Sequence, residues 1–90
     1  MTFKTVHINT LDMNPFTKIG KEWLLITAGT VDNCNTMTAS WGGLGFLWNR
    51  NVATVYIRPQ RYTKLFVDDN DMFTLSFFGR DFRKALTYIG

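Results

Sequence analysis

Two polar segments of this chain carry the side chains that could bind a small molecule. Residues 35–43 form a run of small and hydroxyl side chains that includes the indole of Trp41 and ends in two glycines. Residues 58–63 read Arg-Pro-Gln-Arg-Tyr-Thr, and they offer two guanidinium groups with a phenol and a hydroxyl nearby. A flat aromatic face and a pair of arginines together suit a ligand that is partly aromatic ring and partly phosphate.

The second segment is a candidate phosphate site. Arg58 and Arg61 lie between a predicted strand and a predicted helix. The planar guanidinium group matches phosphate oxygens in a bidentate way, and free N–H groups at a helix start near Arg61 would point to the same place. Tyr62 and Thr63 would add hydroxyl donors. The alternative is that both arginines are solvated or pair with the aspartates of residues 68–71.

The first segment has the alternation of a strand, which divides its side chains between two faces. One face carries the hydroxyl groups of Thr36, Thr38 and Ser40. The other face carries Met37, Ala39 and Trp41. The hydroxyl face is either solvent-exposed or part of a polar ligand groove, and Trp41 either stacks on a ligand or belongs to a core or an interface.

Side chains that perform catalysis by themselves are scarce in this sequence. His7 is the only histidine, and it has no identifiable partner. Cys34 is the only cysteine, so there is no internal disulfide, and no nearby cation would activate its thiol. The sequence contains no metal-binding motif, no Ser-His-Asp order and no GxGxxG. We therefore predict no catalytic side chain and no metal site, and any reaction would need a cofactor that supplies the reactive atoms.

Short strands predominate among the elements that would position these residues. We predict strands over residues 2–8, 23–28, 36–41, 52–57 and 72–78, and helices over residues 61–69 and from residue 81 onward. Residues 11–20 predict a loop or a single helical turn. The glycines of residues 42–45 predict a break in the strand, where they either permit positive φ or let something approach the backbone closely. The pattern favours a mostly β fold with few helices, a small β-barrel or an α+β sheet rather than an α/β parallel sheet, in a single domain over residues 1–90. These strands alone would not close a barrel.

Composition adds expectations about partners and location. Hydrophobic residues make up 46% of the 90 positions and aromatic residues 16%, so we expect apolar surface to be hidden against another subunit, a further segment or a cofactor. The net charge of +3 is mild and does not choose among anions. The apolar runs are too short for a membrane helix, and no signal segment opens the chain. We therefore expect a cytoplasmic protein with no membrane partner.

Four stretches together resemble the flavin reductase-like family, whose members are FMN-binding split barrels and include the flavoredoxins. The resemblance rests on residues 23–29, 35–43, 58–63 and 73–78, and their order and spacing extend it over nearly the whole chain after Pro15. Domains of this family are about twice as long. The resemblance therefore implies the N-terminal part of a split barrel.

The resemblance also implies a ligand, a reaction and a partner. It implies a homodimer that holds FMN non-covalently near the subunit interface, with NAD(P)H as the possible co-substrate that donates a hydride to the flavin. Flavoredoxin-like members act instead as electron carriers. By analogy, the flavin is lined by Met37, Thr38, Ala39, Ser40 and Trp41. The phosphate end is held by Arg58, Arg61, Tyr62 and Thr63.

Two other classes of function stay open at this point. A cofactor-free half-barrel that serves as an assembly or interaction module would explain the high aromatic content and the unclosed barrel. Binding of single-stranded nucleic acid would suit a small barrel with basic turns. The mild net charge argues against that second class, so we expect no nucleic-acid partner.

Overall fold

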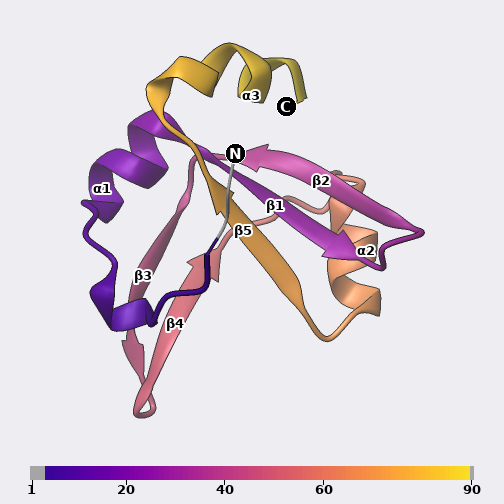
Figure 1. Cartoon of the computed structure of the whole chain (residues 1–90). Helices are drawn as coiled ribbons and strands as arrows, with labels where there is room; N and C mark the ends of the chain where they lie inside the picture. The colour runs from indigo at the N-terminus through magenta and orange to yellow at the C-terminus, as the bar shows by residue number, and fades with distance from the viewer. Residues whose placement is uncertain (1–3, 90) are drawn as a thin grey trace.

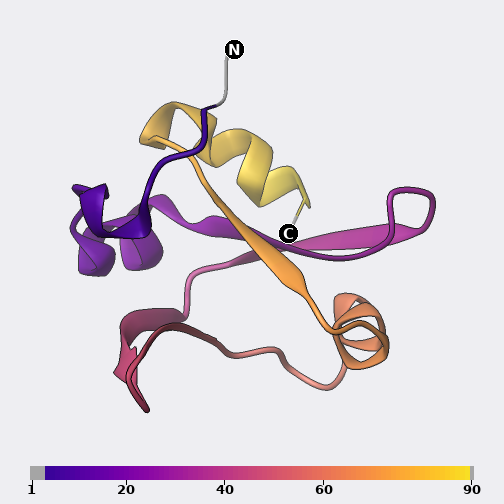
Figure 2. The same cartoon turned by 60° about the horizontal axis from the view of Figure 1, so that its bottom comes forward.

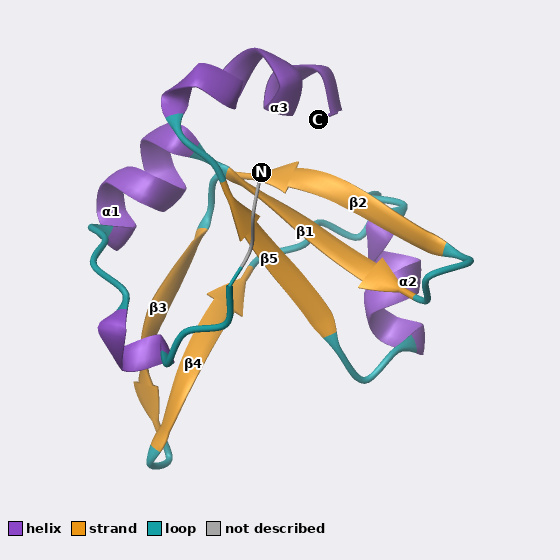
Figure 3. Ribbon diagram, in the orientation of Figure 1, coloured by secondary structure: helices purple, strands orange, loops and turns teal. Residues whose placement is uncertain are grey.

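The chain folds mostly into strands, with few and short helices. The computed structural model describes residues 4–89 (Figure 1). The strands are β1 (Leu24–Gly29), β2 (Cys34–Ala39), β3 (Gly42–Leu47), β4 (Arg50–Val55) and β5 (Phe73–Phe77). The helical elements are η1 (Ile8–Thr10), α1 (Pro15–Thr17), the π-helical turn η2 (Lys18–Glu22), α2 (Thr63–Asp69), η3 (Arg80–Phe82) and α3 (Arg83–Ile89) (Figure 3). The prediction of a mostly β chain with few helices is confirmed.

The strands form two separate antiparallel sheets. One sheet has the order β2-β1-β5, and the other is the β3–β4 hairpin. β1 is the central strand, and its residues alternate between buried and half-buried along its length. The continuous apolar run of residues 23–28 predicted this strand. Such a run is typical of a strand whose two faces are both covered by other parts of the fold. Four of the five predicted strands are present, with ends shifted by one or two residues.

The two sheets do not close into a barrel. Within residues 4–89, no strand of the β3–β4 hairpin pairs with a strand of the other sheet. Figure 2 shows α3 on one side of the three-stranded sheet and the hairpin on the other side. The link between β2 and β3, and the segment between β4 and α2, connect the two layers. This is the open arrangement that the sequence predicted for these strands alone.

The hydrophobic core lies between the three-stranded sheet and the β3–β4 hairpin. Its buried members are Ile19, Leu24, Ile26, Met37 and Ala39. Partly buried side chains from Val55, Ile57, Leu75 and Phe77 pack against them. Val55 and Ile57 come from the end of β4 and the segment after it, so the core attaches the hairpin to the three-stranded sheet.

The predicted strand over residues 2–8 is wrong where the structure describes it. Residues 2 and 3 lie outside the described part of the chain, and residues 4–7 form no strand. The Asn9 N–H donates to Nδ1 of His7 (3.1 Å), and the Thr10 hydroxyl donates to the His7 carbonyl (2.7 Å). These local bonds turn the chain into η1, because they give the backbone an alternative to a strand ladder.

The predicted break over residues 42–45 is also wrong. The break lies at Ser40 and Trp41, and the glycines belong to β3. Gly42 pairs with Val55 at φ +157°, and a Cβ atom at this position would lie 2.5 Å from the Thr54 carbonyl oxygen. Here glycine allows a close approach between two strands, which is one of the two roles expected for these glycines.

We expect Gly29→Ala to lower the free energy of unfolding by about 1–3 kcal/mol, the range for a residue in a disfavoured backbone region. Gly29 has φ +119°, and an added Cβ would lie 2.7 Å from Cα of Cys34. Gly45→Ala is the matched control in another strand, because no atom lies within 4 Å of its added Cβ. Urea denaturation of both variants tests this, and equal stabilities would contradict the strained geometry of the β1–β2 turn.

Candidate functional site

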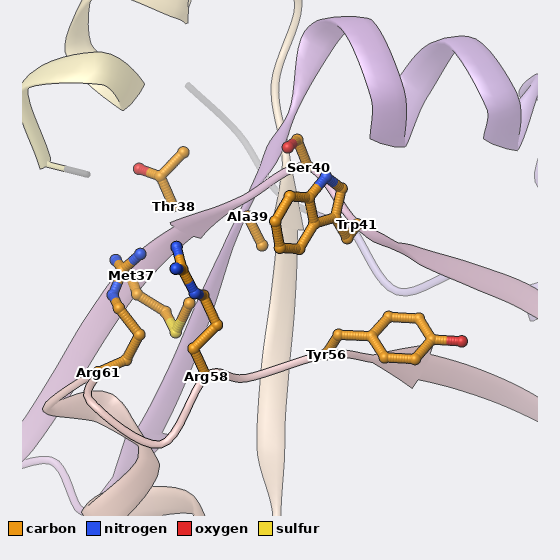
Figure 4. A pocket seen from close by; sticks show the side chains of 8 residues that line it. All are labelled: Met37, Thr38, Ala39, Ser40, Trp41, Tyr56, Arg58 and Arg61. Atoms are coloured by element: carbon orange, nitrogen blue, oxygen red, sulfur yellow. The ribbon is translucent and has the colours of Figure 1, made fainter.

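A pocket lies where the two sheets are joined, and we call it the junction pocket. Its lining residues are Met37, Thr38, Ala39, Ser40, Trp41, Tyr56, Arg58 and Arg61 (Figure 4). The cavity volume is about 130 Å³. Seven of the nine residues predicted to bind a cofactor therefore lie around one cavity. They come from two segments that are far apart along the chain.

The paths of two connections bring these side chains together. β2 ends at Ala39, and the chain leaves the sheet through Ser40 and Trp41 to begin β3. After β4 the chain returns across the junction in extended form and then turns, with the Arg61 N–H donating to the Arg58 carbonyl (3.0 Å). This hydrogen bond closes the turn that holds the two arginines on the same side of the pocket (Figure 4).

The junction pocket is polarised from one end to the other. Figure 4 shows the guanidinium groups of Arg58 and Arg61 at one end, and the rings of Trp41 and Tyr56 at the other. Trp41 and Tyr56 are exposed over 60% and 62% of their surface, so both rings are available to a ligand. An anion would be favoured at the first end and a flat ring at the second.

The two arginines keep their charge available. Among the side chains that the structure describes, the ion pairs are Lys18–Glu22 (3.4 Å) and Lys64–Asp68 (2.6 Å), and neither includes Arg58 or Arg61. The structure therefore does not show the alternative, in which Arg58 and Arg61 pair with the aspartates of residues 68–71. Two unpaired guanidinium groups at one end of a pocket produce a positive local potential, which favours binding of an anion.

The row of hydroxyl groups on β2 is mostly used within the fold. Thr36 Oγ1 lies 2.8 Å from Thr27 Oγ1 and donates to the Ile26 carbonyl (3.1 Å). Thr38 donates to the Leu86 carbonyl (2.5 Å), which ties α3 to β2. Within the described chain, Ser40 is the hydroxyl of this row that has no hydrogen-bond partner. Of the three, it is the one left to a ligand.

Tyr62 and Thr63 do not line the junction pocket. Thr63 is 1% exposed, and its hydroxyl accepts a hydrogen bond from Nδ2 of Asn35 (2.8 Å). Tyr62 is exposed, and its ring packs edge-to-face on Phe66 with centroids 5.3 Å apart. The structure thus places Thr63 as a support that joins α2 to β2, and a phosphate-binding role for either residue stays a prediction.

Tyr56 is a pocket residue that sequence reasoning missed. It follows β4 directly and lies two positions before Arg58. Residues two apart in an extended segment share a face, so alternation along residues 56–58 could have placed Tyr56 beside Arg58. The predicted strand over residues 52–57 includes Tyr56 as part of its apolar run and assigns it no contact with a ligand.

Two further cavities adjoin the junction pocket. By itself the pocket is smaller than the roughly 300 Å³ of a typical small-molecule site, so a larger ligand must extend beyond it. A cavity of about 290 Å³ beneath α3 shares Thr38, Ala39, Ser40 and Arg61 with the pocket. A cleft of about 340 Å³ on another side shares Ser40 and Trp41. The site is therefore a small polar centre with two adjoining spaces.

The cavity beneath α3 contains a residue with an unusual backbone. Trp23, which lines it, has φ +69° and ψ 175° at the end of η2. That region is nearly restricted to glycine and costs about 1–3 kcal/mol. The Arg83 guanidinium carbon lies 3.9 Å from the centroid of the Trp23 ring, a cation–π contact that offsets part of this cost. The indole is held beside the site despite its backbone strain.

Other site types receive no support from the described residues. In the described chain, no group of three or more His, Cys, Asp or Glu side chains could hold a metal ion. No helix within residues 4–89 is long and apolar enough to cross a membrane. No family model, no curated protein and no solved structure matches the chain.

Proposed function

We propose that the protein binds FMN and belongs to the flavin reductase-like split barrels, acting as an NAD(P)H-dependent flavin oxidoreductase or as a flavin-based electron carrier. The observation that carries this proposal is the polarised junction pocket, with two unpaired arginines at one end and two exposed aromatic rings at the other. FMN has the matching division, because its phosphate and its isoalloxazine ring lie at opposite ends of the ribityl chain.

Each part of the pocket fits one part of this ligand. Arg58 and Arg61 would hold the phosphate through charge-assisted hydrogen bonds. Met37 and Ala39, both buried, supply an apolar floor, while Ser40 offers a hydroxyl to a polar edge of the ligand. The isoalloxazine ring would lie against the exposed rings of Trp41 and Tyr56 and extend past Tyr56 toward solvent, because the junction pocket alone is too small for it.

The protein's part in such a reaction is binding and orientation. The bound flavin supplies the hydride and electron chemistry, which this chain's own side chains cannot perform. The pocket contains hydroxyl and guanidinium groups but no histidine or carboxylate. Its residues therefore fix the ligand, neutralise the phosphate charge and cover part of the ring.

The first experiment is purification from a host that makes FMN, followed by visible absorption spectroscopy and titration with added FMN. We expect the absorption bands of oxidised flavin, saturable binding at one flavin per chain, and then flavin reduction on addition of NADH or NADPH. A colourless protein that also fails to bind added FMN contradicts the proposal. Binding without reduction by either nicotinamide supports the electron carrier over the reductase.

A second candidate, a cofactor-free assembly module, is favoured by a different observation. An apolar groove of about 660 Å³ lies between the N-terminal segment, the β3–β4 hairpin and β5. The hairpin also exposes Phe46, Leu47 and Trp48, apolar residues that commonly mark an interface. A second copy of the chain would cover this surface as a homodimer. Size-exclusion mass beside the flavin titration separates the two candidates, because a stable dimer without flavin favours this one.

A further inference from the structure

We propose that the cleft on the far side of Trp41 is a second binding site, for a neutral, flat aromatic compound distinct from FMN. This Trp41 cleft lies between the helical turns of α1 and η2 and the start of β3. Its volume of about 340 Å³ falls within the range of small-molecule sites, roughly 300–1,000 Å³. It adjoins the junction pocket through Ser40 and Trp41.

Two exposed aromatic rings flank the Trp41 cleft. Phe16 is 86% exposed and Trp41 is 60% exposed, and they come from segments about 25 residues apart in the sequence. A large apolar ring that faces water beside a cavity gains free energy when another ring covers it. The pair therefore suits a planar guest that contacts both.

Two glycines keep the cleft open. No atom lies within 4 Å of the position of an added Cβ at Gly20 or Gly43, and neither residue has the positive φ that would require glycine. A glycine within a helical turn is less favourable than alanine, so the backbone gains nothing from Gly20. At both positions the missing side chain leaves space for a ligand to approach the main chain.

The charge of the lining selects the class of ligand. None of the residues that line the Trp41 cleft carries a charged side chain, and its side-chain hydroxyl comes from Ser40. Within η2, Lys18 is paired with Glu22 (3.4 Å), and Lys21 is exposed and does not line the cleft. An anion would thus lose hydration without gaining a cation. The cleft differs in this from the junction pocket with its two arginines, and we assign to it an uncharged compound of one or two fused aromatic rings.

The test uses 2-naphthol as the neutral probe and naphthalene-2-sulfonate as its anionic counterpart, with the whole chain and no added FMN. We expect 2-naphthol to shift the NMR signals of the Gly20 and Gly43 amides and of the Trp41 indole in a saturable way. The sulfonate should bind at least about tenfold more weakly there, because burial penalises its charge. Absence of a saturable shift at these three groups overturns the proposal.

Two variants locate the bound probe. Gly43→Val fills the cleft and should weaken 2-naphthol binding by about tenfold or more, the effect of a few methyl groups in an apolar pocket. Gly45→Val adds the same side chain to the same strand outside the cleft and should keep the affinity. Phe16→Ala removes an exposed ring without disturbing the core, so it decides the question if Gly43→Val fails to fold.

The same variants separate this proposal from the proposed function. Arg58→Ala should weaken FMN and leave 2-naphthol unchanged, while Phe16→Ala should weaken 2-naphthol even if the protein never binds FMN. Binding of 2-naphthol in a protein that refuses FMN leaves the cleft proposal standing alone. If the affinity for 2-naphthol is the same in wild type, Gly43→Val and Phe16→Ala, the probe binds elsewhere and the proposal is wrong.

Discussion

Arg58→Ala is expected to weaken FMN binding by about 1.5–3 kcal/mol, which corresponds to a dissociation constant raised by roughly 10- to 150-fold. The reason is the loss of a charge-assisted hydrogen bond to phosphate from a guanidinium group that no carboxylate among the described residues pairs with. Quenching of flavin fluorescence on titration with protein measures this directly. The ionic strength must be held constant, because salt screens the exposed Arg58 side chain.

Arg50→Ala is the matched control for this prediction. Arg50 is an exposed arginine at the start of β4, outside the junction pocket, and its removal changes the net charge by the same amount. We expect its FMN affinity to stay within about twofold of wild type, since a single distant surface charge is screened. Arg58→Lys keeps the charge but loses the bidentate fork, so its affinity should fall between the two. Equal losses in Arg58→Ala and Arg50→Ala would remove Arg58 from the site.

Ile26→Ala is expected to lower the free energy of unfolding by about 2–5 kcal/mol, the range for truncating a fully buried aliphatic side chain. Ile26 is 0% exposed at the centre of β1, opposite Met37 on one neighbouring strand and Leu75 on the other. Because total stabilities of small domains are about 5–15 kcal/mol, this loss is a large fraction of the whole. Urea denaturation followed by circular dichroism measures it.

The control for the core is Val31→Ala in the turn between β1 and β2. Val31 is 100% exposed, so we expect a change within about 0.5 kcal/mol, as for other surface substitutions. The two variants remove apolar groups of similar kind and differ mainly in burial. If Ile26→Ala were tolerated as well as Val31→Ala, the three-stranded sheet would not be the centre of the core.

The parts of the fold that the sequence predicted are those with a strong local signal. The apolar run of residues 23–28 predicted β1, and the β-branched run of residues 52–57 predicted β4. The alternation of residues 2–8 gave a wrong strand prediction, because alternation does not reveal that His7 accepts a hydrogen bond from the Asn9 backbone. The glycines of β3 gave a wrong prediction of a break at residues 42–45, because glycine occurs both in turns and where two strands approach closely.

The candidate site was predictable in residue type but not in spatial arrangement. Arginines beside a turn and hydroxyls near an indole indicated a ligand with a phosphate and a ring, and the structure places most of these residues around one cavity. Thr63 shows the limit, because its buried hydroxyl accepts a hydrogen bond from Asn35, 28 positions earlier in the chain. The position of Tyr56 likewise depends on how the chain crosses from β4 to α2. Neither the Thr63–Asn35 contact nor the place of Tyr56 in the pocket can be recognised from residues that are close together in the sequence.

The junction pocket takes one wall from β2 and the other from the segment after β4, so its shape exists only while the two sheets are docked. Any ligand that needs both walls binds the docked state and not the separated one. Binding and folding are then thermodynamically linked, and ligand at about one hundred times its dissociation constant adds about 2.7 kcal/mol to the stability of the docked form. In a chain with a core as small as this one, the occupant of the pocket becomes part of what holds the hairpin in place.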